Sequence, residues 1–344
     1  MTISVGIIGA TGVVGQRYIQ LIENHPLFDI EVITASSNSV ANTYQDIVKW
    51  GLSTPIPIDI SKMEIKATEV KSIPSDVEIL FSALPSGIAA KVESEFCKEG
   101  YIVASNSSNG RMDEDVPLII PEINSDHLEL IEIQRDNREW DGALIKNPNC
   151  SVMALAPTLK ALDKFGIEKV HVATLQALSG AGYRGVPSMQ IMENVIPYIE
   201  GEEDKLETEP QKILGHFEDD KISMHGMTVL ASCNRVGVID GHLENVWVES
   251  REKITEETAK ESFHGLNGLD LPSSPNPFIE VHEDPSRPQP RLDRDVGNGM
   301  SISVGGIKET LAGIQYNCLA HNTIRGAAGA SILNGELISE SKWF

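Results

Sequence analysis

The segment Asn147-Pro148-Asn149-Cys150-Ser151 carries the residue best suited to covalent chemistry in this sequence, a cysteine on a tight polar turn. An apolar run, Ala143-Leu144-Ile145, precedes the turn, and a helical pattern from Val152 to Leu162 follows it. The sulfur of Cys150 is therefore expected at a helix N-terminus, where the helix dipole and unpaired N–H groups favour the nucleophilic thiolate over the thiol. The alternative is a buried, unreactive cysteine, which is what most free cysteines are. The other polar residues of the sequence decide between a reactive and an unreactive Cys150.

Several polar residues in the second half of the sequence could complete a reaction site with this cysteine. Arg235 and His242 lie seven residues apart and flank a turn, so two strands of a hairpin-like unit could carry them to one cleft. Gln176 ends a strand pattern, while Glu209 and Lys212 are spaced to share one helical face. Each residue alone is typical of ordinary surface or core positions. Together they provide an imidazole able to shuttle a proton near neutrality, an orienting amide, and cations for an anionic substrate.

The N-terminal residues predict the phosphate-binding turn of a dinucleotide fold. A strand pattern from Ile3 to Ile8 runs into the glycine turn Gly9 to Gly15, and a helical pattern continues through Ile22. Glycines at such a turn let the backbone approach a pyrophosphate, whose charge the helix N–H groups meet. The spacing is G-x-x-G-x-x-G rather than G-x-G-x-x-G, so the motif alone is weak, and a tight turn without a ligand is the alternative.

The end of the second strand pattern, Ile30 to Ala35, predicts which dinucleotide would bind. NAD-binding folds place a carboxylate there to bind the ribose hydroxyls. This sequence has Ser36-Ser37-Asn38-Ser39 instead, with hydroxyls to receive a 2′-phosphate and no carboxylate to repel it. We therefore predict NADP(H) rather than NAD(H). Beside a cysteine nucleophile, this cofactor suggests that a thiolate attacks an activated acyl group and that the thioester is reduced to an aldehyde.

Two further strand patterns end in polar segments that suit a ligand. Val77 to Ala83 is almost wholly apolar, as in a strand buried on both faces, and a helical pattern follows from Ile88 to Lys98. Tyr101 to Ala104 leads into the hydroxyl-rich loop Ser105 to Arg111. The carboxyl ends of parallel strands face the ligand crevice, so this loop suits a phosphate or carboxylate. A solvated turn is the alternative.

After Cys150 the strand patterns alternate apolar and polar residues, which is typical of half-buried antiparallel strands. We expect a solvated helix start in the acidic tract Glu200 to Glu209, a loop from Pro272 to Pro290, and a helix from Thr323 to Ser339 that returns to the first domain. The predicted fold is thus α/β, with an N-terminal Rossmann-like dinucleotide-binding domain and a C-terminal α+β domain with a mostly antiparallel sheet. The alternating strands are expected at residues 169–178, 227–233, 243–249, 301–305 and 314–320.

The composition of the sequence indicates the number of domains and argues against several classes of protein. The 344 residues suggest two domains, and 50 acidic against 28 basic side chains give a net charge of −22, which should repel nucleic acid and anionic membranes. The four cysteines lie far apart without a C-x-x-C pair, so neither disulfides nor a zinc site is expected, and we predict no metal. With no signal peptide and no apolar run near the ~20 residues of a membrane helix, the sequence predicts a cytoplasmic protein.

Over essentially its whole length the sequence resembles aspartate-semialdehyde dehydrogenases of the archaeal and fungal type. Several motifs occur in the same order with compatible spacing, which is more specific than any single motif. The matching segments are GATGVVGQ (9–16), SNSSNGRM (105–112), NPNCS (147–151), QALSGAGYRGVPS (176–188), ETEPQKILG (207–215), NRVGVIDGH (234–242) and HNTIRGAAGASIL (321–333).

The resemblance implies reversible, NADP-dependent reductive dephosphorylation of 4-aspartyl phosphate to aspartate 4-semialdehyde, in lysine (diaminopimelate), threonine, methionine and isoleucine biosynthesis. It implies that Cys150 forms the acyl-thioester, that His242 is the acid/base, and that Gln176 orients the substrate. It also implies an NADP-binding domain of residues 1–149 and 322–344, a catalytic and dimerisation domain of residues 150–321, and a homodimer or homotetramer assembled through the second domain's sheet.

The resemblance further implies a set of binding residues. Arg235 would hold the substrate carboxylate and Glu209 its ammonium group. The phosphate would be bound by Arg111 and Lys212, with Asn149 and Ser108 nearby. The implied NADP contacts are Gly9, Thr11, Gly12, Val13, Val14, Ser36, Ser37, Ser39, Ser82, Ser179, Gly180 and Asn322.

Two departures and three rival functions accompany the resemblance. Pro210 directly follows Glu209, which a helix tolerates only if Glu209 lies near its start. Asn234 stands where relatives often have histidine. Malonyl-CoA reductase would share the fold and the cysteine, and N-acetyl-glutamyl-phosphate reductase is a more distant rival, but neither has a substrate ammonium for Glu209. A redox-sensing NADP-binding regulator without catalysis is the non-enzymatic alternative.

Overall fold

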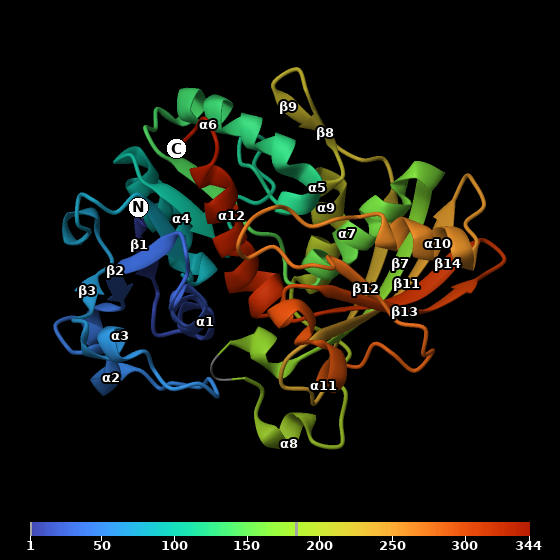
Figure 1. Ribbon diagram of the computed structural model, residues 1–344, viewed down its shortest axis with the longest axis horizontal. Coiled ribbons are helices and arrows are strands. Elements are labelled where there is room, and N and C mark those ends of the chain that lie inside the picture. Colours follow the sequence, from blue (N-terminus) through green and yellow to red (C-terminus); the bar gives the residue numbers. More distant parts are fainter. Residues whose placement is uncertain (1, 183–184) are drawn as a thin grey trace.

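The computed structural model describes residues 2–182 and 185–344, which form two six-stranded sheets separated by helices (Figure 1). Tyr183 and Arg184, within the segment 176–188, lie outside the described residues. The first sheet occupies the left half of Figure 1 and the second sheet the right half, with the C-terminal helix between them. Within the described ranges, no helix is both long enough and apolar enough to cross a membrane.

The first sheet has six strands in the order β3-β2-β1-β4-β5-β6, and all neighbours are parallel. This order is that of dinucleotide-binding folds, which confirms the Rossmann-like prediction. The residues of β4, β5 and β6 are all buried because helices cover both faces. The strands are β1 Ile3–Ile8, β2 Phe28–Ala35, β3 Lys66–Ala67, β4 Ile79–Ser82, β5 Ile102–Ser105 and β6 Ala143–Lys146.

The C-terminal helix packs against this first sheet. It contacts β4, β5 and the first helix, and its Ile332 and Ile338 join the same apolar cluster as Val5 and Phe81. A π-helical turn precedes it directly. The helices associated with the first sheet are α1 Val13–Ile22, α2 Tyr44–Ile47, α3 Ile58–Lys62, α4 Ser86–Lys98, α5 Pro121–Asn124, α6 Leu130–Arg138, the π-helix η7 Ile324–Ala328 and α12 Gly329–Ser339.

The second sheet has the order β10-β7-β11-β14-β13-β12. The three central pairings are antiparallel and the two outer ones are parallel, so the sheet is mixed, as a mostly antiparallel α+β domain allows. A separate hairpin joins β8 and β9. The strands are β7 Ile167–Gln176, β8 His216–Glu218, β9 Lys221–Ser223, β10 Thr228–Arg235, β11 His242–Ser250, β12 Ile279–Val281, β13 Ile302–Glu309 and β14 Gly313–Ala320.

The expected hairpin between the strands of Arg235 and His242 is wrong, because β7 lies between β10 and β11. Arg235 at the end of β10 pairs with Gln176 at the end of β7, and His242 begins β11 next to it. The antiparallel course of β11 brings its first residue to the edge where β7 and β10 end. Three adjacent strands therefore place Gln176, Arg235 and His242 at one edge of the sheet.

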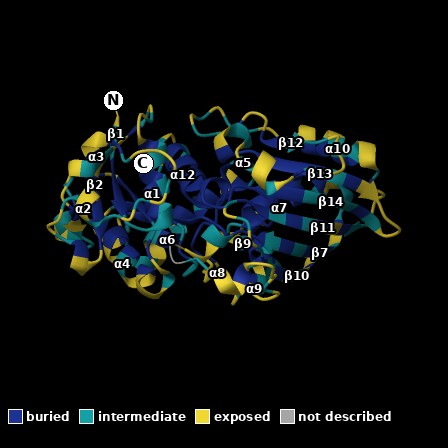
Figure 2. Cartoon of the chain, turned by 90° about the horizontal axis from the view of Figure 1, so that it is seen from below, coloured by how far each residue is buried: buried dark blue, intermediate teal, exposed yellow. Residues whose placement is uncertain are grey.

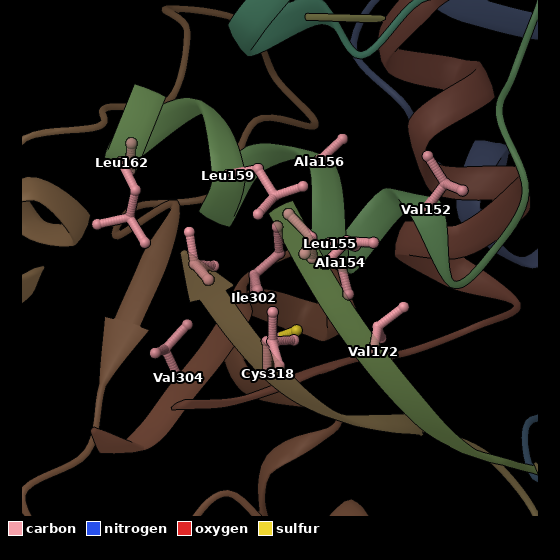
Figure 3. Packing of buried hydrophobic residues seen from close by; sticks show 14 of the residues in the cluster. Val152, Ala154, Leu155, Ala156, Leu159, Leu162, Val172, Ile302, Val304 and Cys318 are labelled. Atoms are coloured by element: carbon pink, nitrogen blue, oxygen red, sulfur yellow. The ribbon is translucent and has the colours of Figure 1, made fainter. Parts of the chain in front are cut away.

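Helices cover one face of the second sheet. Leu155 and Leu159 pack against Ile302, Val304 and the other inward residues of the strands (Figure 3). Along β11 every second residue from the first to the seventh is buried, and the intervening ones are more exposed (Figure 2). The described residues leave the opposite face without a covering layer. The helices of this half are α7 Val152–Leu162, α8 Ser188–Ile191, α9 Glu202–Ile213, α10 Glu256–His264 and α11 Pro290–Asp293.

Candidate active site

Cys150 lies between β6 and α7, with its Sγ 3.2 Å from Nε2 of His242. It is partly exposed and lines a cavity of about 410 Å³ between the two sheets. Gly326 of η7 packs directly against it, since a Cβ on Gly326 would lie 2.7 Å from the Cβ of Cys150. The structure thus brings the expected nucleophile and the expected imidazole into contact at an open cavity.

The sulfur does not receive the helix N–H groups that the sequence suggested. Asn149, two residues before the N-cap Ser151 of α7, accepts two nearby N–H groups: its side-chain Oδ1 accepts that of Ser151 at 2.9 Å, and its carbonyl accepts that of Met153 at 3.0 Å. Burial, followed by the charge of Glu202, raises the pKa of the Cys150 thiol to about 12. Burial thus opposes the thiolate form that the position at a helix start was predicted to favour.

His242 is fully buried and both ring nitrogens have partners. Its Nδ1 accepts the backbone N–H of Ala177 at 3.0 Å, while Nε2 faces the sulfur of Cys150. Burial, followed by the charge of Arg235, lowers the pKa of His242 to about 3. Burial thus favours the neutral form of this imidazole, and its role as the acid/base stays a prediction.

Glu202 is a site residue that the sequence interpretation missed, because the acidic tract was taken as solvated. It is 9% exposed, lines the cavity, and its Oε2 accepts the amides of Asn149 at 2.9 Å and Gln176 at 3.3 Å. Burial alone would raise the pKa of Glu202, but Lys205 and these two amides lower it below its usual value. Lys205 also lines the cavity, 2.6 Å from Oε1 of Glu202. The same three-residue spacing that drew attention to Glu209 and Lys212 could have identified this pair.

Glu209 and Lys212 lie two helical turns further along α9, away from the cavity. One oxygen of Glu209 pairs with Arg111 at 2.8 Å, and the other accepts the backbone N–H of Asn149 at 2.6 Å. The ammonium of Lys212 donates to the carbonyls of Arg111, Asp113 and Val116, all within 2.8 Å. All three of its hydrogens are therefore used, and the arrangement does not present Lys212 to a phosphate.

Pro210 is accommodated near the end of α9, not near a helix start as the sequence suggested. The helix continues past it, since the N–H of Leu214 bonds the carbonyl of Pro210 at 2.9 Å. Glu209 is therefore the eighth of twelve helical residues, and its position is held by Arg111 and Asn149.

Arg111 is 6% exposed and reaches the cavity from the loop after β5. Two of its nitrogens are paired, with Glu209 and with the carbonyl of Asn106, both at 2.8 Å. Its buried Nε has no hydrogen-bond partner among the described residues. Ser108 and Asn149 line the same cavity. A guanidinium with an unused buried donor beside hydroxyl and amide groups suits an oxyanion.

Arg235 and Gln176 lie behind the lining of the catalytic cavity, next to residues that form it. Arg235 is 6% exposed, and its Nη1 donates to the carbonyl of Ala177 at 2.7 Å. Gln176 is buried and bonds Glu202 and Thr174. Gly180, which follows β7, lies directly over Arg235 and His242 and lines the cavity. These groups surround Cys150 on the side of the second sheet.

A second, larger cleft of about 750 Å³ adjoins the catalytic cavity and suits a dinucleotide. The two spaces share Gly12 and the segment 83–85 as lining. Gly9 has φ +82°, and a Cβ there would lie 2.9 Å from the carbonyl oxygen of Ala83, so only glycine leaves this turn open. No side chain caps α1, so its first N–H groups remain for an anion. The large cleft is lined by Gly9, Thr11, Gly12, Ser36 and Ser37, and the catalytic cavity by Gly12, Val13, Val14, Ser179, Gly180 and Asn322.

Two of the expected cofactor contacts do not reach these spaces. Ser82 is fully buried and donates its hydroxyl to Glu93 at 2.7 Å, and Ser39 is buried and lines neither space. Glu69, which the sequence interpretation did not consider, also lines the large cleft, and Nζ of Lys71 lies 3.2 Å from its carboxylate. Of the three serines in the loop after β2, Ser36 and Ser37 therefore line the large cleft and Ser39 does not.

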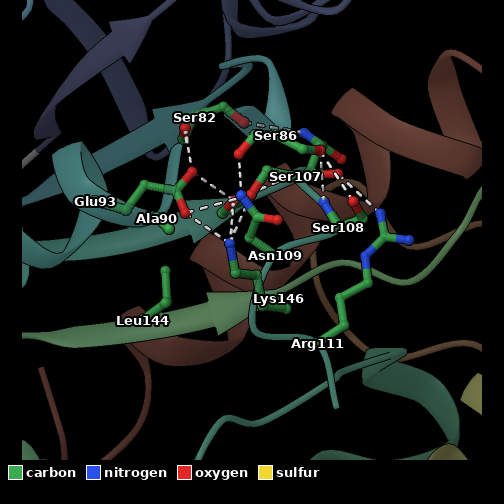
Figure 4. Close-up of polar contacts among 12 residues, drawn as sticks. Ser82, Ser86, Ala90, Glu93, Ser107, Ser108, Asn109, Arg111, Leu144 and Lys146 are labelled. Atoms are coloured by element: carbon green, nitrogen blue, oxygen red, sulfur yellow. Dashed lines mark hydrogen bonds and ion pairs between the residues drawn. The ribbon is translucent and has the colours of Figure 1, made fainter. Parts of the chain in front are cut away.

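A buried ion pair lies under the loops that carry the site (Figure 4). Nζ of Lys146, at the end of β6, is 2.6 Å from Oε2 of Glu93 on α4, and both side chains are fully buried. The hydroxyls of Ser82, Ser105 and Ser107 donate to Glu93. The ammonium of Lys146 donates to Glu93, Ser105 and Ser107, so all three of its hydrogens are used. The network ties the ends of three neighbouring strands immediately before the turn of Cys150.

We expect Lys146→Met to lower the free energy of unfolding by roughly 3–5 kcal/mol, because it leaves the buried carboxylate of Glu93 without its counter-ion. The double variant Glu93→Leu/Lys146→Met should recover most of that loss. Chemical denaturation of the purified variants measures both effects. Equal loss in the single and the double variant would show that packing, not the uncompensated charge, accounts for the change.

Comparison with known proteins gives consistent matches. Family models described as "Semialdehyde dehydrogenase, NAD binding domain" and "Semialdehyde dehydrogenase, dimerisation domain" match residues 4–131 and 155–325. The aspartate-semialdehyde dehydrogenase of Archaeoglobus fulgidus is 53% identical over 99% of both chains, and that of Aspergillus fumigatus is 43% identical over 96% of both. The solved structure of the Candida albicans enzyme with NADP is 35% identical, covers 100% of both chains and has a TM-score of 0.91. Aspartate semialdehyde dehydrogenase II from Vibrio cholerae, complexed with ASA, is 25% identical over 99% of each chain, with a TM-score of 0.77.

Proposed function

The chain belongs to the aspartate-semialdehyde dehydrogenase family, and from this premise we propose that it converts 4-aspartyl phosphate reversibly to aspartate 4-semialdehyde with NADP(H). This reaction would serve lysine, threonine, methionine and isoleucine biosynthesis. One observation carries the proposal: the sulfur of Cys150 contacts His242 in a cavity that continues into a dinucleotide-sized cleft. A thiol, an imidazole and a nucleotide cleft in one place are the parts required to form a thioester and reduce it.

Cys150 is the proposed nucleophile that forms the acyl-thioester, with Gln176 orienting the acyl group. Its partial exposure to the cavity and its contact with His242 support this role. Gln176 lies at the strand edge beside Arg235 and bonds Glu202, so its amide is held in place before a substrate arrives. A pre-oriented amide loses little freedom on binding, which favours a reactive geometry.

The phosphate is assigned to Arg111, with Ser108 and Asn149 beside it. The unused buried Nε of Arg111 supports this assignment, because a phosphate oxygen would satisfy it. Lys205 replaces Lys212 as the second cation of the site, since Lys205 lines the cavity and Lys212 does not. Both cations also offset the chain's strongly acidic charge where an anionic substrate must enter.

The amino-acid end of the substrate is assigned to Arg235 and Glu202. Arg235, which lies directly beneath Gly180 of the cavity lining, would bind the carboxylate, and Glu202 would bind the ammonium group. Glu202 replaces Glu209 in this role because Glu209 is already paired with Arg111 and does not line the cavity. Glu209 then acts on the substrate only through Arg111 and the backbone of Asn149.

NADP(H) is the proposed cofactor, and the residues of the large cleft fit it. The glycine turn and the uncapped N-terminus of α1 would hold the pyrophosphate, and the hydroxyls of Ser36 and Ser37 would receive the 2′-phosphate. When bound, the cofactor supplies or accepts the hydride. Asn322 donates to Ser179 at 2.8 Å and accepts the N–H of Gly241 at 2.8 Å, which fixes the wall where the cleft meets the catalytic cavity.

A paired substrate assay tests the function. Purified protein should reduce NADP in the presence of aspartate semialdehyde and phosphate or arsenate, and should reduce NAD more slowly. It should oxidise NADPH negligibly with malonyl-CoA or with N-acetyl-glutamyl phosphate. Activity with malonyl-CoA and none with aspartate semialdehyde would replace the proposal by the rival reductase, and no turnover with any substrate would favour a non-catalytic NADP-binding regulator.

Self-association through the uncovered face of the second sheet is also proposed. Trp247 is 37% exposed at the centre of this face, where its strand neighbours are His171 and Gln315, and Leu230 on the edge strand is 45% exposed. A large aromatic residue on an open sheet face is typical of a subunit interface. A second copy of the chain would cover it in a homodimer or homotetramer.

We expect Trp247→Glu to weaken the dimer by about 30-fold or more, the cost of losing a central aromatic contact of roughly 2 kcal/mol. Light scattering over a dilution series measures the molecular mass. Leu311→Glu, at a fully exposed turn between β13 and β14, is the matched control and should leave the mass unchanged. A Trp247→Glu protein that stays dimeric throughout the series would exclude this face.

A further inference from the structure

Asn147 is a buried amide directly after β6, three residues before Cys150. It is 1% exposed and lines neither the large cleft nor the catalytic cavity. Its Nδ2 donates to the carbonyl of Ala327 at 2.9 Å and to Oδ1 of Asn106 at 3.0 Å, and its Oδ1 accepts Nδ2 of Asn334 at 2.9 Å. Both ends of this amide are therefore hydrogen-bonded behind the site.

The orientation of the Asn147 amide follows from its partners. The backbone carbonyl of Ala327 can only accept a hydrogen bond, so the atom that faces it must be the nitrogen. Aspartate has the same shape but would place an oxygen against this carbonyl and against Oδ1 of Asn106. Leucine of similar size would leave the partners in this buried region unsatisfied. The position therefore requires the donor and the acceptor that asparagine combines.

The first connection of Asn147 is to the loop that carries Arg111. Asn106 follows β5, and its carbonyl accepts Nη2 of Arg111 at 2.8 Å. The backbone N–H of Asn147 also donates to the carbonyl of Ser105 at 2.8 Å, so its main chain and its side chain bind the same loop. Asn106 and Arg111 line the catalytic cavity together with Cys150. The position of the guanidinium relative to the cysteine turn thus depends on Asn147.

The second connection of Asn147 is to the C-terminal helical segment. Ala327, which accepts its amide, adjoins Gly326, and Gly326 packs against Cys150. Asn334 lies seven residues further along, on α12, and donates to the same side chain. Asn147 is therefore held at two places by η7 and α12, so its side chain does not depend on the Arg111 loop for its own position.

Building on the proposed function, we propose that Asn147 is a positioning residue that sets the separation between the sulfur of Cys150 and the guanidinium of Arg111. These two groups would act on one acyl phosphate, because the sulfur must reach its acyl carbon while the guanidinium holds its phosphate. Their separation must therefore match the length of that group. A displacement of about 1 Å at a reacting atom can cost about 10²-fold in rate.

Gln134 on α6 provides a comparison for a purely structural amide. It is fully buried, and its Nε2 donates to the carbonyls of Asp115 at 3.2 Å and Leu144 at 3.1 Å. Its Oε1 accepts the N–H of Leu144 at 2.7 Å. Gln134 thus makes as many hydrogen bonds as the side chain of Asn147 and binds the same strand, β6, but it lines neither the cleft nor the cavity.

Steady-state kinetics of Asn147→Leu with aspartate semialdehyde, NADP and phosphate test the proposal. The KM for phosphate should rise about 10- to 100-fold, the cost of a weakened hydrogen bond to a charged group, and kcat should fall by about 10²-fold. Binding of NADPH and alkylation of Cys150 by iodoacetamide should keep their normal constants, because neither needs Arg111. Gln134→Met should lower the thermal stability comparably but leave the KM for phosphate and kcat unchanged.

A folded Asn147→Leu protein with an unchanged KM for phosphate would overturn the proposal. An equal rise in Gln134→Met would do the same, since loss of buried packing would then explain it. Joint loss of NADPH binding and of Cys150 alkylation would also overturn it, because the damage would be general.

Asn334→Ala decides the question if Asn147→Leu does not fold. It removes only the hydrogen bond to Oδ1 of Asn147, so the KM for phosphate should rise about 2- to 10-fold, and an unchanged value would contradict the proposal. No turnover by the unaltered protein would reject the proposed function and this inference with it. Normal turnover by the unaltered protein and an unaffected KM in the variants would reject the inference alone.

Discussion

Replacing Cys150 with serine should lower kcat by roughly 10⁴- to 10⁶-fold while NADPH still binds, because a hydroxyl is a far weaker nucleophile at this position. The sulfur is the proposed nucleophile and contributes little to packing, since one side of it faces the cavity. Steady-state rates with aspartate semialdehyde and phosphate measure the loss, and fluorescence titration measures NADPH binding. The two readouts separate damage to the nucleophile from damage to the dinucleotide cleft.

The matched control is Cys97→Ala. Cys97 is fully buried on α4 and lines neither the cleft nor the catalytic cavity, so its replacement should leave kcat unchanged at a small cost in stability. A Cys150→Ser protein with normal turnover would reject covalent catalysis and with it the proposed function. Loss of both turnover and NADPH binding would instead show that Cys150 supports the fold.

Gly326→Ala should lower kcat by about 10²-fold without unfolding the protein. A Cβ on this residue would lie 2.7 Å from the Cβ and 3.1 Å from the Cα of Cys150, so the backbone on one side must move. η7 is held firmly, because neighbouring Arg325 makes two hydrogen bonds to Glu122, at 2.7 and 2.8 Å, in a fully buried pair. The nucleophile is therefore expected to shift, and a shift of about 1 Å at a reacting atom can cost about 10²-fold.

Gly226→Ala is the control for this substitution. Nothing lies within 4 Å of a Cβ built on Gly226, so alanine should change neither kcat nor stability appreciably. Thermal unfolding of both variants shows whether each is folded. A folded Gly326→Ala protein with unchanged kcat would mean that the turn of Cys150 tolerates displacement and that its packing against η7 does not set the reacting geometry.

Local sequence patterns were sufficient to predict most strands of the first sheet. β1 begins and ends where the apolar run does, and β4, β5 and β6 read as apolar because helices bury both faces. The glycine turn before α1 also appears where predicted, because its shape depends on neighbouring residues alone. Short elements such as β3 and α2 were not predicted, since so few residues give no periodic signal.

The second sheet shows what local patterns could not reveal. The alternation along β7, β10 and β11 predicted the strands, but strand order depends on long-range pairing, so the hairpin of Arg235 and His242 was expected where β7 intervenes. The sequence predicted that Arg235 and His242 could reach one cleft. It did not predict the strand order that brings them together. Antiparallel and parallel neighbours both leave a period of two, which is why the mixed pairing gave no signal.

The details of the site depended on contacts between distant residues. Glu202 and Glu209 are both acidic residues of one helix, and only the fold shows that the first lines the cavity while the second pairs with Arg111. The three carbonyls that occupy Lys212 come from a segment about 100 residues earlier. The backbone N–H of Ala177 that bonds the ring of His242 has no side-chain signature at all.

The π-helical turn from Ile324 to Ala328 carries one more residue per turn than the α-helix that follows it. Removing a single residue there would restore an uninterrupted α-helix and rotate everything beyond the deletion by about 100°. Either α12 would no longer pack against β4 and β5, or Gly326 would no longer contact Cys150. The length of this short segment therefore determines both how α12 packs on the first sheet and where Gly326 meets Cys150. We expect natural insertions and deletions to be absent from it.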